Sequence, residues 1–243
     1  MSKVLEVCVD SLESALAAIE GGATRLELCA NLLIGGTTPS VYLYEEIRKR
    51  SDIPIHVLIR PRFGDFLYSA SEVTIMKKSI EDFVKAGAEG VVIGVLDVDG
   101  KLAVDAMRLL IDAAGTRKVV LHRAFDVAKS PFVVLEQAVE LGITGILTSG
   151  QRNTALAGKE LLIRFLEQAD NRLEILIGGG VNASVIEVFR QESRAYAFHL
   201  SGKQAYPSKM RYRNPDVSMG FGSLDEYEYW YTNPALIRAA WKV

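Results

Sequence analysis

Short apolar runs alternate with amphipathic segments along most of the chain. The apolar runs are rich in valine, isoleucine and leucine, and each is too short for a helix, so they predict buried strands. The segments between them repeat apolar residues at helical spacing and are bounded by serine, proline or glycine. The predicted strands are 4–9, 25–29, 55–59, 90–95, 118–122, 145–148, 172–177 and 195–200. The predicted helices are 11–20, a second that starts near 38–40 and runs to 50, 71–86, 104–114, 131–141, 155–169 and 183–192.

Strands that are apolar throughout and separated by helices predict a parallel sheet covered on both faces. Eight such units in about 200 residues favour an α/β fold of the closed TIM (β/α)₈ type, with an open eight-stranded sheet as the alternative. No linker-like segment divides the chain, which predicts a single domain. We expect the barrel over residues 1–202 and a C-terminal extension over 203–243 that packs on the barrel or on a subunit neighbour. The extension holds an aromatic-rich segment, 221–231, and a last predicted helix around 234–241.

Composition narrows the class of protein. The chain has 243 residues, 49% apolar and 24% charged, as in soluble proteins with a substantial core. A net charge of −2 gives no electrostatic case for binding nucleic acid or an anionic membrane. No apolar run approaches the ~20 residues of a membrane span, and the N-terminus lacks a signal-peptide pattern. Two cysteines make no disulfide framework, so we expect free thiols and a cytoplasmic location.

Polar residues gather where the predicted strands end. In a TIM barrel the functional site lies at the carboxyl ends of the strands, so this clustering predicts a site at one mouth of the barrel. The residues concerned are Glu6, Cys8, Glu27, Cys29, Arg60, Arg62, Asp65, His122, Arg123, Asp126, Thr148, Ser149, Gly179, Gly180, His199 and Ser201.

A repeated pattern contains the only two cysteines. Leu-Glu-Val-Cys at 5–8 recurs as Leu-Glu-Leu-Cys at 26–29, so each strand presents an acid and a thiol on one face. Neighbouring strands lie ~4.8 Å apart, close enough for Cys8 and Cys29 to share a soft ion. Two thiolates suit Cu(I) better than zinc, which needs four ligands. The alternative is that both are small buried apolar residues.

The third strand is followed by Arg60-Pro61-Arg62 and then Asp65. Two guanidinium groups on a stiff turn can bind a carboxylate or a phosphate. The alternative is that they neutralise the two glutamates of the repeated pattern, because carboxylates at a barrel mouth need cations.

The fifth strand ends in His122, followed by Arg123 and Asp126. A histidine titrates near neutral pH, so His122, with Glu27 or Asp126, is a candidate for proton transfer. The alternative makes His122 a hydrogen-bonded core residue and Asp126 a helix cap. His199, at the end of the eighth strand, is a further candidate ligand.

The glycines after the seventh strand occupy the usual position of a barrel phosphate site. Gly179 and Gly180 would let backbone N–H groups approach an anion, with Ser201 after the eighth strand and Ser149 after the sixth beside them. A sharp turn would require glycine there in any case.

Nine segments together resemble the CutC family of copper homeostasis proteins. They are LEVCVDS, GGATRLELCA, GGTTPS, IRPRFGDFLYS, GVLDVDGK, HRAFD, LTSG, GGGV and MRYRN, and they run from Leu5 to Asn214. The resemblance implies a TIM barrel, a cytoplasmic homodimer or homotetramer, and Cu(I) bound at Cys8 and Cys29. The loop and helix around Ile34 and Val41 depart from the family pattern without loss of a polar site residue.

Three functions follow as hypotheses. The first is a copper homeostasis protein that binds Cu(I) through two cysteines at the barrel mouth. The second is an enzyme of unknown reaction that acts on a small phosphorylated or carboxylated metabolite, because the arginines, acids and histidines at the mouth suit an anion. The third is an oligomeric binding module without chemistry at the mouth.

Overall fold

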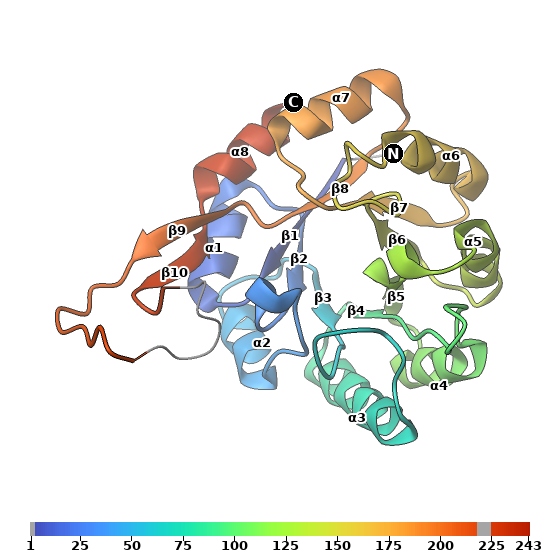
Figure 1. Ribbon diagram of the computed structural model, residues 1–243, viewed down its shortest axis with the longest axis horizontal. Coiled ribbons are helices and arrows are strands. Elements are labelled where there is room, and N and C mark those ends of the chain that lie inside the picture. The colour runs from blue at the N-terminus through green and yellow to red at the C-terminus, as the bar shows by residue number, and fades with distance from the viewer. Residues whose placement is uncertain (1–2, 218–224) are drawn as a thin grey trace.

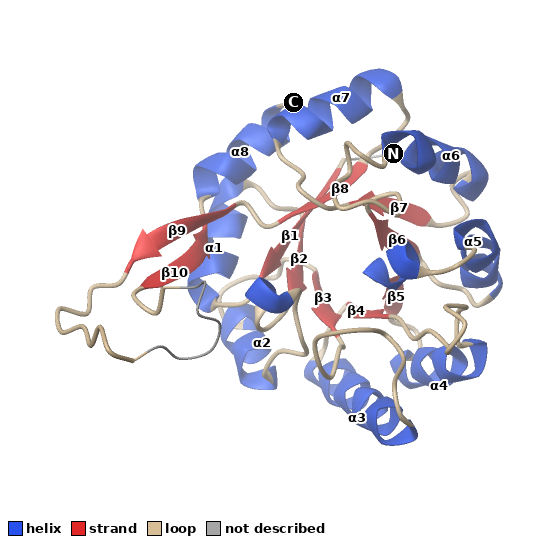
Figure 2. Cartoon of the chain, viewed as in Figure 1, coloured by secondary structure: helices blue, strands red, loops and turns tan. Residues whose placement is uncertain are grey.

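Eight parallel strands close into a barrel in the order of the chain (Figure 2). The computed structural model describes residues 3–217 and 225–243. The barrel strands are β1 (Val4–Val9), β2 (Arg25–Leu28), β3 (Ile55–Leu58), β4 (Gly90–Ile93), β5 (Lys118–Leu121), β6 (Gly145–Thr148), β7 (Glu174–Ile177) and β8 (Ala197–Leu200). The strand β1 pairs with both β2 and β8, which confirms the closed TIM barrel and excludes the open sheet.

A ring of helices covers the outside of the barrel (Figure 1). Its first seven members are α1 (Leu12–Gly21), α2 (Val41–Arg48), α3 (Ala70–Ala86), α4 (Val104–Ala114), α5 (Pro131–Glu140), α6 (Lys159–Ala169) and α7 (Ala183–Glu192). Side-chain caps set several helix starts. The helix α3 begins one residue earlier than predicted, because Ser69 forms a capping box with Glu72.

The barrel strands separate two apolar cores. Side chains that point outward pack beneath the helices and form the larger core. Side chains that point inward form a smaller cluster inside the barrel, made of Cys8, Cys29, Leu58, Val92, Val120, Leu147, Leu176 and Ala197. Because side chains alternate along a strand, the polar residues in step with this inner cluster also face the barrel interior.

The chain after β8 forms a hairpin and returns to the barrel. The hairpin strands β9 (Lys203–Pro207) and β10 (Glu228–Thr232) are antiparallel and extend away from the barrel (Figure 1). The predicted last helix is α8 (Pro234–Lys242), which packs between α1 and α7. Of the aromatic-rich segment, residues 221–224 lie outside the described residues, and 228–231 belong to β10. The division of the chain after residue 202 stays a prediction.

Short 3₁₀ helices follow two of the barrel strands at its carboxyl end. They are η1 (Leu32–Ile34) after β2 and η2 (Arg123–Val127) after β5. Both lie over the mouth that carries the predicted site residues. Both contribute to the pocket described below, through Leu32 of η1 and Arg123 of η2.

Candidate functional site

A buried carboxylate, Glu6, connects three strands inside the barrel. Arg25 lies beside it on β2 and donates from Nε to Oε2 at 2.5 Å. His199 lies beside it on β8, with Nδ1 2.8 Å from Oε1. Burial by itself raises the pKa of Glu6, but the Arg25 and His199 charges outweigh it and hold the pKa well below its usual range. Glu6 is therefore a permanent negative charge.

His199 stands between the interior and the mouth. Its Nδ1 lies 2.8 Å from Oε1 of Glu6, while its Nε2 lies 3.7 Å from Oε2 of Glu27. Burial alone would lower the pKa of His199, but interactions with the neighbouring Cys8 side chain and with the carboxylates of Glu27 and Glu6 raise it well above its ordinary value. The ring is therefore a positively charged imidazolium near neutral pH, with a proton on each nitrogen. Any metal ion that binds at Nε2 has to displace the proton there.

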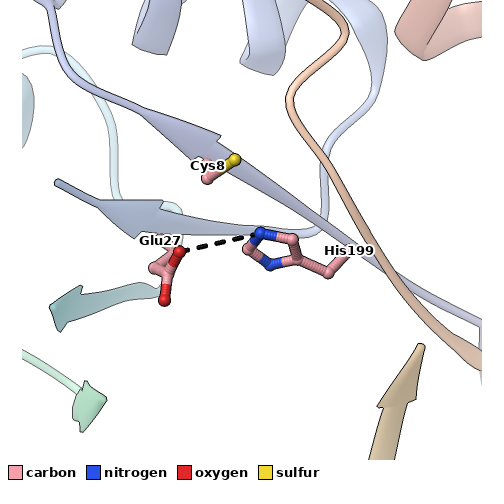
Figure 3. Close-up of side chains that lie close together, drawn as sticks. All are labelled: Cys8, Glu27 and His199. Carbon is pink, nitrogen blue, oxygen red and sulfur yellow. Dashed lines mark ion pairs between the residues drawn. The ribbon is translucent and has the colours of Figure 1, made fainter. Parts of the chain in front are cut away.

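Cys8, Glu27 and His199 bring a sulfur, an oxygen and a nitrogen together (Figure 3). One ligand atom from each lies within 4.8 Å of the others. The Cys8 thiol meanwhile donates to the carbonyl of Leu200 at 3.7 Å. A carboxylate behind a metal-binding histidine orients the ring, which is the relation of Glu6 to His199. The arrangement can hold a metal ion or pass a proton.

Cys29 is on the same wall but outside this group of three. Its thiol donates to Oε2 of Glu27 at 3.4 Å. Burial, together with the Glu27 charge, raises the pKa of Cys29 well above its usual value, so the residue is a thiol near neutral pH. The two predicted metal ligands thus differ in their surroundings, and Cys29 has to release a proton before it can bind a metal.

The mouth contains a pocket of about 180 Å³. Both cysteines, Glu27 and His199 form one part of its wall, and Arg60 and His122 belong to the rest. The full lining is Cys8, Glu27, Cys29, Leu32, Gly35, Leu58, Arg60, Phe66, His122, Arg123, Leu147 and His199. Seven of the predicted site residues, from five different strands or loops, therefore meet at one cavity.

The two arginines after β3 do not act as a pair. Arg60 is buried and donates to backbone carbonyls, those of Gly36 and Gly64 among them. Arg62 is turned outward and forms ion pairs with Asp65 at 3.0 Å and Glu72 at 2.7 Å. The predicted alternative, that both neutralise Glu6 and Glu27, is wrong, because Glu6 takes its charge partners from β2 and β8. Only Arg60 lines the pocket.

Asp126 organises a loop instead of orienting His122. Its carboxylate accepts from Thr148, from Ser149 and from Nε of Arg123, the last at 2.7 Å. These donors occupy both oxygens, and none comes from His122, whose Nδ1 accepts from the backbone N–H of Ala124 at 3.2 Å. Ser149 is likewise fully buried within this network. The proton-transfer role predicted for Asp126 has no contact to support it.

The glycines after β7 face a different hollow. Gly180 and Ser201 line a depression of about 570 Å³ between the start of α7 and the helix α8. Gly179 instead lies against Ser149, where a Cβ would approach Cβ of Ser149 to 2.9 Å. This hollow shares no lining residue with the pocket at the mouth. Gly180 is thus separate from the thiols and from Arg60, whereas Ser201 also lines a small pocket together with Cys8.

Sequence reasoning missed two members of the site. Arg25 also donates to Glu174 at 2.7 Å, so a second acid on β7 completes the charge network. Phe66 lines the pocket and packs against both Arg60 and His122. A charged residue facing Glu6 on an otherwise apolar strand was a signal for Arg25. Phe66 gave no signal, because a single aromatic residue in a loop has no characteristic pattern.

The sequence was compared with protein families and with curated proteins. The model of the CutC family matches residues 3–204. A family protein CutC from Xanthomonas campestris pv. campestris (strain B100) is 44% identical over 214 residues, which are 88% of this chain and 89% of the relative. One from Vibrio vulnificus (strain CMCP6) is 42% identical over 240 residues, 98% of this chain and 96% of the relative.

Solved structures show the same fold. A crystal structure described as a copper homeostasis protein CutC, from Streptococcus agalactiae, has 32% identity and a TM-score of 0.78, and covers 82% of this chain and 98% of its own. An aldolase named QR15 has 15% identity and a TM-score of 0.59, with 81% and 89% covered, which is a likeness of fold alone. No helix in the described part of the chain has the length and apolar character to cross a membrane. The chain belongs to the CutC family.

Proposed function

We propose that this chain is a copper homeostasis protein that binds Cu(I) at the barrel mouth through Cys8 and Cys29. The observation that carries the proposal is the position of both thiols, on neighbouring strands and in the wall of one pocket. Cu(I) prefers soft ligands and accepts a low coordination number. The copper homeostasis description of the Streptococcus agalactiae relative supports the same function. A homodimer or homotetramer in the cytoplasm, where thiols stay reduced, belongs to the proposal.

The other residues around the thiols fit a cargo ion. His199 offers a third, nitrogen ligand within 4.8 Å of Cys8. Glu27 accepts a hydrogen bond from the Cys29 thiol in the metal-free chain. Leu58 and Leu147 add apolar surface to the pocket wall, and such a surrounding protects a Cu(I)–thiolate bond from water.

The test is competition against a Cu(I)-specific chelator under reducing, oxygen-free conditions. We expect one Cu(I) per wild-type chain and no tight binding in the Cys8→Ser/Cys29→Ser double variant, because serine hydroxyls are poor ligands for a soft ion. Each single variant should bind more weakly than wild type. Thermal unfolding of each variant shows that it is folded. Unchanged stoichiometry and affinity in the double variant would overturn the proposal.

The second predicted function, an enzyme that acts on a small phosphorylated or carboxylated metabolite, stays a prediction. One described feature favours it. Glu6, His199 and Glu27 form a chain in which each group lies within 3.7 Å of the next, and the groups differ widely in proton affinity. Perturbed titratable groups in a cavity are typical of acid–base catalysis.

A further inference from the structure

Arg60 is a buried cation without a counter-ion. It is 7% exposed, and its Nη atoms donate to the neutral carbonyls of Gly35, Gly36 and Gly64, at 2.7–3.2 Å, with the neutral Tyr68 hydroxyl also beside the guanidinium. No ion pair among the described residues includes it, and its Nε has no acceptor. Arg25, the other buried arginine, contacts two carboxylates. A buried charge is normally paired, so Arg60 lacks the partner that its position calls for.

His122 is a buried donor without an acceptor. The residue is 4% exposed, and its Nδ1 accepts a hydrogen bond from the Ala124 N–H. An imidazole that accepts at Nδ1 carries its hydrogen on Nε2. That Nε2 has no partner among the described residues. Burial, with the nearby Arg60 charge, lowers the pKa of His122 to about 3, which agrees with a neutral ring. Buried polar atoms in native proteins are almost always satisfied.

The two groups belong to one wall of the mouth pocket. Phe66 joins them, with its ring centre 5.0 Å from the Arg60 guanidinium and 4.8 Å from the His122 ring. Leu58 and Leu147 continue this wall. The remaining arginine of the pocket, Arg123, is already neutralised by Asp126. The wall thus combines one uncompensated positive charge, two unused N–H donors and apolar surface.

We propose that this pocket binds a small organic carboxylate, with its carboxylate group held by Arg60 and His122. One negative charge balances the one free cation, and two oxygens match the two free donors, Nε–H of Arg60 and Nε2–H of His122. The apolar wall of Leu58, Phe66 and Leu147 suits a short carbon chain. A volume of about 180 Å³ admits a few-carbon acid and excludes nucleotides and large cofactors. Its donors, Arg60 and His122, lie in the same pocket as the thiols but are not ligands of the proposed Cu(I) site.

Entry of the ligand involves Phe66. Both nitrogens are shielded from water, and this partly exposed ring is the side chain that packs on both groups. Turning the one ring aside opens both donors to the pocket. The far end of the ligand then points to Cys8, Glu27 and His199, which line the rest of the cavity.

The experiment titrates metal-free protein with acetate, propionate and succinate, and with inorganic phosphate for comparison. Binding is followed by thermal shift and by the NMR signal of the His122 Nε2–H. We expect at least one carboxylate to raise the melting temperature and to move this signal downfield, as a hydrogen bond to a charged acceptor requires. Phosphate should bind at least about tenfold more weakly, since it carries more than one negative charge near neutral pH and the wall offers a single uncompensated positive charge.

A matched pair of variants isolates the donor. His122→Asn keeps an oxygen for the Ala124 N–H but does not reach the Nε2 position, and it should weaken carboxylate binding about tenfold or more. His122→Gln places an amide donor there and should keep most of the affinity. Arg62→Gln removes a positive charge from the same loop without lining the pocket, and should bind within about twofold of wild type.

Three results would overturn the proposal. They are no response to any of the carboxylates, stronger binding of phosphate than of every carboxylate, and equal binding by wild type and His122→Asn. None of them bears on Cu(I) binding at the cysteines, so failure here and failure of the proposed function can be told apart.

Discussion

Buried histidines make the folded chain sensitive to acid at the scale of single residues. His122 has its pKa lowered to about 3 and His56, on β3, to about 4, in both cases chiefly by burial. The unfolded value is 6.5 for each, so the unfolded chain takes up protons that the folded chain refuses as pH falls below 6.5. Stability is therefore fully present above this pH and is lost on acidification toward the folded pKa.

The prediction concerns the slope of stability against pH. Each of these histidines lowers the free energy of unfolding by about 1.4 kcal/mol per pH unit between about pH 6 and the folded pKa. Below pH 6, the free energy of unfolding of His122→Asn should fall less steeply with decreasing pH than that of wild type, by the contribution of one proton. Above pH 7 the slopes of the variant and of wild type should agree. Urea unfolding from pH 8 to 5 measures both. Parallel curves below pH 6 would show that His122 is protonated in the fold.

Some single-residue features were predictable and others were not. The inward direction of Glu6 and Cys8 follows from strand alternation, and the pocket confirms it for the cysteine. The partners of Arg60 and Arg62 were not predictable. They depend on how the loop after β3 folds back. This fold brings the Gly64 carbonyl to Arg60, and Glu72 of the following helix to Arg62.

At the scale of an element, β4 provides room for the histidines of both neighbouring strands. A Cβ at Gly90 would lie 2.5 Å from Cδ2 of His56 on β3. A Cβ at Gly94, just after β4, would lie 2.6 Å from Cε1 of His122, just after β5. The two glycines are four residues apart and so face the same side of the strand. The absence of a side chain at Gly90 and at Gly94 therefore leaves room for both rings.

The prediction for this element is a steric cost. Gly94→Ala should lower the free energy of unfolding by about 1–3 kcal/mol, because the new methyl overlaps the His122 ring in a packed interior. The same substitution made in a His122→Ala background should cost less, with a coupling of about 1 kcal/mol or more. A double-mutant cycle by urea unfolding measures the coupling. Additive effects would mean that the ring and the methyl do not compete for space.

Elements were the most predictable scale. All eight strands and the helices between them occur near the expected positions, because a buried parallel strand and an amphipathic helix have strong and different periods. The start of α6 is the largest difference. Residues 155–158 are outside the helix, since the backbones of Gly150 and Gly158 approach too closely for a side chain on either. The hairpin of β9 and β10 interrupts the alternation of strand and helix and has no counterpart among the expected elements.

At the scale of the whole molecule, α8 fills the last gap in the helical ring. Ile237 and Ala240 are fully buried between it and the barrel, and the Cβ of Ile237 lies 2.5 Å from where a Cβ on Gly21 of α1 would be. Lys3 donates to the carbonyls of Ala240 and Trp241 at the end of the helix. The two ends of the described chain thus hold each other in place.

The prediction is that α8 contributes to global stability. Ile237→Ala should lower the free energy of unfolding by about 2–5 kcal/mol, as for other buried large-to-small substitutions. Leu236, the preceding residue, is 47% exposed, and Leu236→Ala should change it by no more than about 0.5 kcal/mol. Urea unfolding of the two variants compares them directly. Equal, small effects would show that α8 unfolds apart from the barrel.

The Glu6 carboxylate has a consequence for anyone who redesigns the mouth. One of its oxygens serves Arg25 and the other serves His199, so a single group belongs to both ends of the barrel interior. The acidity of the His199 ring can therefore be retuned from Arg25 or Glu174, neither of which lines the pocket. Substitutions confined to the pocket lining would therefore miss this effect. A substitution that neutralises Arg25 or Glu174 would change the charge state at the mouth although neither residue lines the pocket.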